Sequence, residues 1–241
     1  MPVTELVADD SYLPKADPYR DIDATTAYQR SCVSKEIDEM EAKKFSQWLQ
    51  QLRLLVGRHR NLDGDVLELL CGSGRHYPLL QQLKRPVWLS DGSPDMLSAA
   101  RQMHDVTQDN CIEAKLPAFP WTEHSQRFGL VCAHWLLYYL QDSACSEVLR
   151  RLPEILTPTG YFATTEPLTE GDQDYYGHPV VPKSEEQLTA LLNGIPGLSI
   201  NKVFHHEAYV VETDEGLIEM PPSITWLLQR ASKSLEDPLT V

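Results

Sequence analysis

The stretch Leu67-Glu-Leu-Leu-Cys-Gly-Ser-Gly-Arg75 decides the fold class of this 241-residue chain. It lies within and after the apolar run Val66–Leu70, which is typical of a strand buried on both faces of a parallel sheet. The run passes into two closely spaced glycines and then into a helical pattern. Because ligands bind at the carboxyl ends of parallel strands, glycines there allow a ligand to approach the backbone. For this fragment alone, a tight turn that binds nothing is the alternative.

The residues around the glycines narrow the class of ligand. A dinucleotide-binding turn needs a third glycine where this chain has Tyr77, and a Walker phosphate loop needs Gly-Lys-Ser/Thr where it has Arg75-His76. Glu68 inside the strand would sit badly beside a pyrophosphate. The turn therefore fits a cationic ligand better than a phosphate-bearing one.

Strand-like and helix-like segments alternate along the chain. Ser34 is the expected N-cap of the first helix, and Gly57 its expected end. Repeated strand–helix units predict a doubly wound α/β fold with a mostly parallel, seven-stranded sheet. We expect residues 1–56 to form an N-terminal arm and helix that acts as a lid, and residues 57–241 to form the ligand-binding domain. Besides 66–70, the predicted strands are 86–90, 110–113, 128–133, 161–165, 199–206 and 223–232, and the predicted helices are 34–56, 76–83, 143–156, 184–192 and one that starts at Ser93-Pro94.

An acid ends the second predicted strand. Asp91 follows the glycine turn at about the distance that ribose recognition requires. A carboxylate at this point can accept hydrogen bonds from both ribose hydroxyls. The alternative role is helix capping, but Ser93 followed by Pro94 is the better cap. We therefore predict that Asp91 binds a ribose.

Five motifs, taken in order, resemble those of class I S-adenosylmethionine-dependent methyltransferases. Each motif is weak alone, and their order makes the resemblance specific over roughly residues 60–166. The motifs are Glu68–Arg75, Ser90–Leu97, Ile112–Pro120 (similar to the adenine-binding stretch), Phe128–Leu140 (the fourth strand and its exit) and Leu149–Gly160 (the helix and turn before strand five), and Trp226–Lys233 resembles the closing strand.

The resemblance implies S-adenosylmethionine as the cofactor and assigns its contacts. The methionine part would lie against Gly72, Ser73 and Gly74, its carboxylate would pair with Arg75, and its sulfonium would lie beside His134. The ribose would be held by Asp91. The adenine would lie near Gly92 and Met96, with its amino group bound by Glu113 and room for its ring left by Ala114, and the cofactor-binding set is completed by Glu68 and Cys71. The chain departs from the family pattern twice. Cys71 stands where another glycine is common, and Gly129 replaces a frequent aspartate.

The acceptor side carries less specific patterns. Methyl transfer is an in-line displacement, for which positioning alone can supply roughly 7–11 kcal/mol. For His134 and Trp135, at the exit of the fourth strand, packing against the adjacent helix is the alternative role. The stretch 134–142 is also similar to protein N-terminal α-amine methyltransferases, whose catalytic histidine would fall at Tyr139. The expected catalytic residues are His134, Tyr139 and Tyr175, and the expected substrate contacts are Tyr19, Tyr28, Trp135, Tyr138, Glu166, Tyr176 and His178.

The net charge and the cysteines limit which classes of partner and which compartment we expect. A net charge of −14 repels phosphate backbones and anionic lipid, so we expect neither nucleic acid nor membrane as partner. The early acids without an apolar run, and five scattered cysteines without a CxxC pair, predict a cytoplasmic protein with reduced thiols and no metal site. We expect a methyltransferase for a small-molecule or short-peptide acceptor, with an amine as one option. The alternatives are a protein N-terminal α-amine methyltransferase and a non-catalytic nucleotide-binding regulator.

Overall fold

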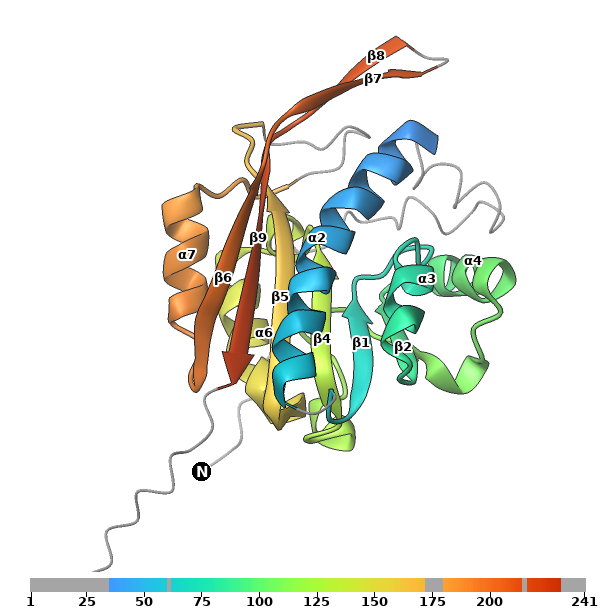
Figure 1. The fold of residues 1–241 in the computed structure, drawn as a ribbon, viewed down its shortest axis with the longest axis vertical. Coiled ribbons are helices and arrows are strands. Elements are labelled where there is room, and N and C mark those ends of the chain that lie inside the picture. Colours follow the sequence, from blue (N-terminus) through green and yellow to red (C-terminus); the bar gives the residue numbers. More distant parts are fainter. Residues whose placement is uncertain (1–34, 60–61, 172–179, 214–215, 231–241) are drawn as a thin grey trace, which may run out of the picture.

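A single seven-stranded sheet organises the chain (Figure 1). The computed structural model describes residues 35–59, 62–171, 180–213 and 216–230. The strand order is β3-β2-β1-β4-β5-β9-β6, in which β9 runs antiparallel to both neighbours and the other pairings are parallel. The predicted doubly wound, mostly parallel sheet is confirmed. The strands are β1 (Asp65–Leu69), β2 (Val87–Asp91), β3 (Cys111–Glu113), β4 (Phe128–His134), β5 (Leu156–Pro167), β6 (Leu198–His206) and β9 (Ser223–Arg230).

Helices cover both faces of the sheet and give it two separate apolar cores. One core includes α2, α3 and α4, and the other includes α6 and α7. Ser93 accepts a hydrogen bond from Met96 N and caps α4, as predicted. The helices are α2 (Lys35–His59), α3 (Tyr77–Leu80), α4 (Pro94–His104), α5 (Leu136–Tyr139), α6 (Asp142–Ile155) and α7 (Glu185–Asn193), with 3-10 turns at Gln81–Leu83, Gln108–Asn110 and Trp121–His124.

The N-terminal helix α2 belongs to the core. Its predicted apolar stripe is buried at Phe45, Trp48, Leu49 and Leu52, and the helix crosses the sheet in Figure 1. The predicted end at Gly57 is wrong, because the helix continues to His59. A glycine costs a helix only about 1 kcal/mol, so it need not end one.

Three further boundaries differ from the sequence pattern. The segment predicted as one helix over 76–83 is a single turn of α3 followed by a 3-10 turn, which ends at Lys84 in the left-handed conformation. The predicted turn at 157–160 is part of β5. A hairpin, β7 (Tyr209–Thr213) and β8 (Gly216–Met220), was not expected and projects beyond the sheet as a continuation of β6 (Figure 1).

The structure explains why residue 129 is a glycine where the family often has an aspartate. A Cβ atom built at this residue would lie 2.2 Å from the carbonyl oxygen of Asp63, far inside van der Waals contact. The register between β1 and β4 shifts between Asp65 and Val66, beside this close approach. The backbone of the 62–65 turn therefore occupies the space that an aspartate side chain would need.

The described part of the chain contains no helix long and apolar enough to cross a membrane. Within the same residues, Cys71, Cys111, Cys132 and Cys145 carry free thiols.

Candidate functional site

The two glycines of the turn after β1 have different surroundings. Both adopt positive φ, +55° at Gly72 and +76° at Gly74. A Cβ at Gly72 would meet no atom of the described residues within 4 Å, whereas one at Gly74 would lie 3.2 Å from the side chains of Leu89 and Ala100. Of the two glycines, Gly72 therefore faces space that no described residue fills, and Gly74 allows the turn to pack against α4. Gly74 therefore does not clear space for a ligand, and ligand binding at Gly72 stays a prediction.

Asp91 joins this turn to the end of β2. Its Oδ2 accepts a hydrogen bond from Gly72 N at 2.8 Å, and its Oδ1 accepts one from Ser93 N at 2.9 Å. The carboxylate and the open glycine are thus held as one rigid unit.

The other predicted cofactor contacts surround this unit. Glu113, the exposed partner of Asp91 in the β2–β3 register, ends β3 at the same edge, and Ala114 N donates to Asp91 O at 3.0 Å. Ser73, Met96 and Ala114 are buried, and Gly92 and Arg75 are partly exposed. Cys71 is buried in the core with its Sγ toward Gly72 O, and burial raises the pKa of its thiol well above the ordinary value.

Glu68 pairs with the side chain of His76. Its Oε1 lies 2.7 Å from Nδ1 of His76, and both side chains are buried. The His76 ring stacks on Phe45 of α2 at a centroid distance of 4.2 Å. The predicted acid beside a cationic ligand is therefore paired with a histidine of this chain.

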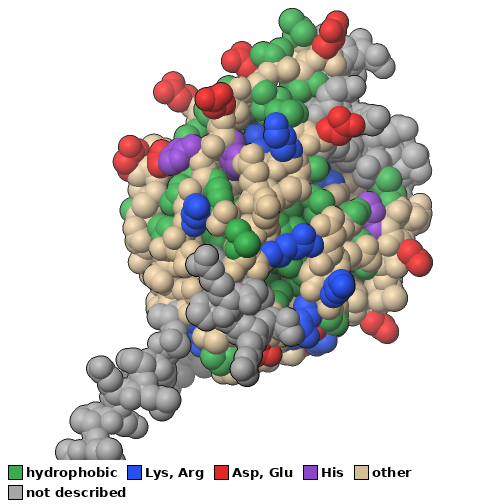
Figure 2. All heavy atoms as spheres, in the orientation of Figure 1, with side chains coloured by type: hydrophobic (Ala, Val, Ile, Leu, Met, Phe, Trp, Pro, Cys, Tyr) green, Lys and Arg blue, Asp and Glu red, His purple; other side chains and the backbone are tan. Residues whose placement is uncertain are grey.

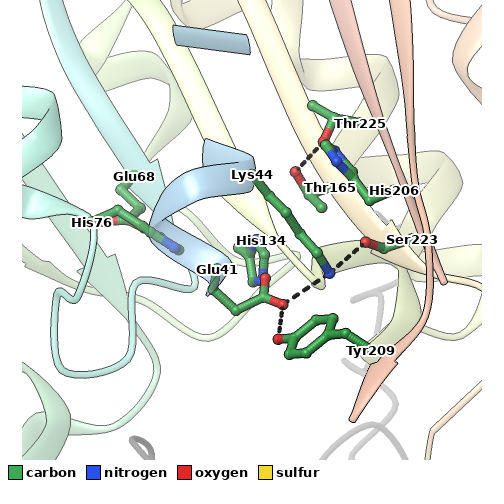
Figure 3. Close-up of polar contacts among 10 residues, drawn as sticks. All are labelled: Glu41, Lys44, Glu68, His76, His134, Thr165, His206, Tyr209, Ser223 and Thr225. Carbon is green, nitrogen blue, oxygen red and sulfur yellow. Dashed lines mark hydrogen bonds and ion pairs between the residues drawn. The ribbon is translucent and has the colours of Figure 1, made fainter. Parts of the chain in front are cut away.

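His134 ends β4 and faces helix α2 (Figure 3). Its Nε2 lies 3.0 Å from Oε2 of Glu41, and its ring centroid lies 5.0 Å from that of His76. Burial lowers the pKa of His134 to about 4. The neighbouring carboxylate of Glu41 opposes this shift, and the charges of His76 and Arg75 add to it. The imidazole is therefore neutral at pH 7.

Glu41 is the hub of the polar contacts in Figure 3. Its Oε1 accepts from Lys44 Nζ at 3.0 Å and from the Tyr209 hydroxyl at 2.7 Å, and Lys44 also donates to Ser223 Oγ at 3.1 Å. Burial alone would raise the pKa of Glu41, but the hydrogen bond and charge of His134, with Lys44 and Tyr209, hold it well below its usual range. The group is a buried carboxylate beside a neutral imidazole.

Our sequence analysis missed Glu41, Lys44 and Tyr209. One indication was present, because Glu41 precedes Phe45 by four residues and so falls on the apolar stripe of α2. An acid on the buried face of a helix needs a partner. The sequence did not show which distant strand would provide it.

Trp135 links the end of β4 to the hairpin. It adopts the left-handed conformation at φ 61°, which is rare for a residue with a side chain, and its ring stacks on His134 at a centroid distance of 5.4 Å. It also packs against the small cluster of Val211, Ile218 and Met220. The hairpin is thereby packed over the residue that ends β4.

Three other predicted site residues, Tyr138, Tyr139 and Glu166, lie in or beside α5. Tyr138 is buried and Tyr139 is partly exposed, with their rings in edge contact. Glu166, buried at the end of β5, accepts from Tyr138 N at 3.1 Å and from the Thr164 hydroxyl. Burial raises the pKa of Glu166 to about 7, against these hydrogen bonds and the charge of Lys183. Both Glu166 oxygens are therefore engaged within the protein, and the hydrogen bond from Tyr138 N ties Oε2 to α5.

The remaining predicted site residues lie outside the described residues: Tyr19, Tyr28, Tyr175, Tyr176 and His178. Among the residues that the structure describes, no group of three or more His, Cys, Asp or Glu side chains forms a metal site.

The chain matches known proteins in two ways: one segment matches a family model, and the fold matches solved structures. Residues 66–160 match the family model of the methyltransferase domain. A SAM-dependent methyltransferase from Leishmania major aligns with TM-score 0.60 and 18% identity over 87% of this chain and 79% of that chain. One from Aquifex aeolicus aligns with TM-score 0.55 and 15% identity over 87% and 100%. Magnesium protoporphyrin IX methyltransferase from Synechocystis, with bound S-adenosylhomocysteine, aligns with TM-score 0.51 and 16% identity over 77% and 82%. No curated protein matches by sequence.

Proposed function

We propose that this chain, whose residues 66–160 match a methyltransferase domain, is a class I S-adenosylmethionine-dependent methyltransferase that methylates an amine of a small molecule or short peptide. The observation that carries the proposal is the neutral, carboxylate-bound His134 at the end of β4. The acceptor itself is identified only by the chemistry around this residue.

The turn after β1 fits the cofactor. The open space at Gly72 admits a ligand against the backbone, and the fixed carboxylate of Asp91 lies beside it. When bound, S-adenosylmethionine supplies a methyl group that its sulfonium has already activated. Glu113 and Ala114 would bind the adenine end. Gly72, Ser73, Arg75, Gly92 and Met96 would line the remaining length.

The acceptor would approach the end of β4. A neutral amine can donate an N–H to a neutral imidazole, which would orient the nitrogen lone pair toward the methyl. An α-amine has a pKa of roughly 7.7–8.0, so a useful share of it is neutral without a strong base.

The electrostatic field supports a cationic or neutral acceptor. The chain carries a net charge of −14. Figure 2 shows acidic side chains at the end of the molecule where the hairpin projects, and Glu207, Glu212 and Glu219 are exposed there. Such a field attracts ammonium groups before they lose a proton. The same acidic edge favours a second candidate acceptor, the α-amine of a protein N-terminus.

We further propose that the N-terminal arm, residues 1–34, covers the acceptor, while α2 belongs to the folded core. Deletion of residues 1–30 should then abolish turnover and leave S-adenosylhomocysteine binding and the melting temperature nearly unchanged. Normal turnover by the truncated protein would exclude the arm from the site.

The experiment for the acceptor class uses isotope-labelled S-adenosylmethionine. The protein is incubated with matched sets of small amines, peptides with free or acetylated N-termini, alcohols and carboxylic acids, and label transfer is measured. We expect transfer to amines and none to acetylated peptides that lack another amine. Transfer confined to alcohols or carboxylates would overturn the proposal.

A further inference from the structure

The Glu41 carboxylate divides its two oxygens between different kinds of neighbour. Both strong donors, Lys44 Nζ and the Tyr209 hydroxyl, bond to Oε1, at 3.0 and 2.7 Å. Oε2 faces Nε2 of His134 at 3.0 Å. The two atoms approach within 3.0 Å without hydrogen-bond geometry, but the negative charge of the carboxylate still favours a proton on the ring nitrogen that faces Oε2.

This arrangement selects one tautomer of His134. The neutral ring carries one proton, and the carboxylate attracts it to Nε2. Nδ1 is then left as an acceptor, and it is a buried nitrogen that makes no hydrogen bond within the described residues. A buried acceptor without a partner is unfavourable, so a ligand that donates to it gains by doing so.

We propose that Glu41, which lies in α2 outside the methyltransferase domain, is the positioning residue that keeps His134 protonated on Nε2 and free to accept at Nδ1. Through Glu41, helix α2 and the β7–β8 hairpin become part of the catalytic unit. This inference rests on the proposed function, in which Nδ1 accepts the N–H of the amine. Its structural part, the tautomer, stands apart from the identity of the acceptor.

Glu41→Gln is a sharp test because the donors fix the orientation of the new amide. Lys44 and Tyr209 both need an acceptor, so they hold the amide oxygen at the Oε1 position. The amide nitrogen then faces His134 Nε2 and donates to it. Nε2 must give up its proton, which moves to Nδ1, and Nδ1 can no longer accept from an amine.

The tautomer is read from ¹⁵N-labelled histidine by two-bond correlation NMR, with His134→Asn to assign the signal. We expect the wild-type protein to show Nε2 protonated and Nδ1 unprotonated, and Glu41→Gln to show the reverse. Tyr209→Phe is the matched control, since it removes a donor from Oε1 and leaves Oε2 against His134; it should keep the wild-type tautomer. The wild-type spectrum tests the inference even if Glu41→Gln fails to fold, because protonation of Nδ1 there would overturn it.

Kinetics supply the second readout. Glu41→Gln should lower kcat for an amine about 10- to 100-fold, with S-adenosylhomocysteine affinity unchanged, because only the orienting hydrogen bond is lost. An unchanged tautomer together with unchanged kcat would overturn the role of Glu41. A switched tautomer in a protein that methylates no amine would instead overturn the proposed acceptor and leave the role of Glu41 in setting the tautomer standing.

Discussion

The proposed cofactor half and the proposed acceptor half of the site are built in different ways. The first is made by backbone turns that follow β1, β2 and β3, with Asp91 tied to Gly72 across neighbouring strands. The second is made by side chains from α2, β4 and the β7–β8 hairpin, which meet at Glu41. The cofactor half therefore depends on local sequence, and the acceptor half on long-range contacts. This difference predicts where mutations change binding and where they change turnover.

The largest effect is expected in the cofactor half. Asp91→Ala should remove two charge-assisted hydrogen bonds to the ribose and release the Gly72 turn. The expected loss is on the order of 2–4 kcal/mol, or roughly 30- to 1000-fold in S-adenosylhomocysteine affinity by calorimetric titration. Asp95→Ala is the control, because it removes the same charge from the first turn of α4. Equal effects of the two changes would show that charge, and not the Asp91 contact, holds the ribose.

The next effect concerns stability in the acceptor half. Because the pKa of Glu166 is raised to about 7 in the folded protein, the folded state holds this proton more tightly than the unfolded state. The resulting stabilisation is complete below the unfolded pKa and is lost as pH rises through about 7. The loss between pH 4.5 and 8 is on the order of 2–3 kcal/mol.

Glu166→Gln isolates this contribution. The amide oxygen can still accept from Tyr138 N, and the variant has no proton to lose. The free energy of unfolding of wild type minus variant, measured with urea, should therefore fall from pH 4.5 to pH 8. Glu170→Gln, at an exposed position, should give a difference that varies much less. A flat difference for Glu166→Gln would mean that the buried carboxylate is ionised throughout this range.

The two glycines of the turn should differ in whether their substitution changes stability or cofactor affinity. Alanine at either position meets a positive φ, at a cost of roughly 1–2 kcal/mol. At Gly74 the added methyl group also presses on Leu89 and Ala100, for about 1–3 kcal/mol more. We expect Gly74→Ala to be the less stable protein in urea, and Gly72→Ala to lose at least about tenfold more affinity for S-adenosylhomocysteine. The reverse order in both assays would contradict the assignment of open space to Gly72.

The sequence predicted the proposed cofactor half because the features of this half are consecutive along the chain. An apolar strand that enters Gly72-Ser-Gly74, and a second strand that ends in Asp91, can be read within thirty residues of one another. The role of Gly129 could not be read, since it depends on the carbonyl of Asp63 in another turn.

The residues of the acceptor half were harder to predict from the sequence, for a physical reason. The hairpin has apolar residues on both faces, because Val210 and Leu217 are exposed while Val211 and Ile218 are buried. The alternation that identifies a half-buried strand is therefore lost. Glu41 was visible as an acid on an apolar helix face, but its partners come from β4 and β7.

The smallest effect should be confined to the hairpin. Tyr209→Phe removes the hydroxyl that donates to Glu41 and leaves the ring beneath Lys44, whose Nζ lies 4.7 Å from the ring centroid. One hydrogen bond to a charged group contributes about 1.5 kcal/mol, so opening of the hairpin should become about tenfold more frequent. Hydrogen exchange of the β7 and β8 amides should accelerate by that factor, while amides of β1 and β4 keep their rates, because the hairpin has its own small cluster outside the two main cores. Acceleration that spreads equally to β4 would show that the hairpin and the sheet open as one unit, and the acceptor half would then be as rigid as the cofactor half.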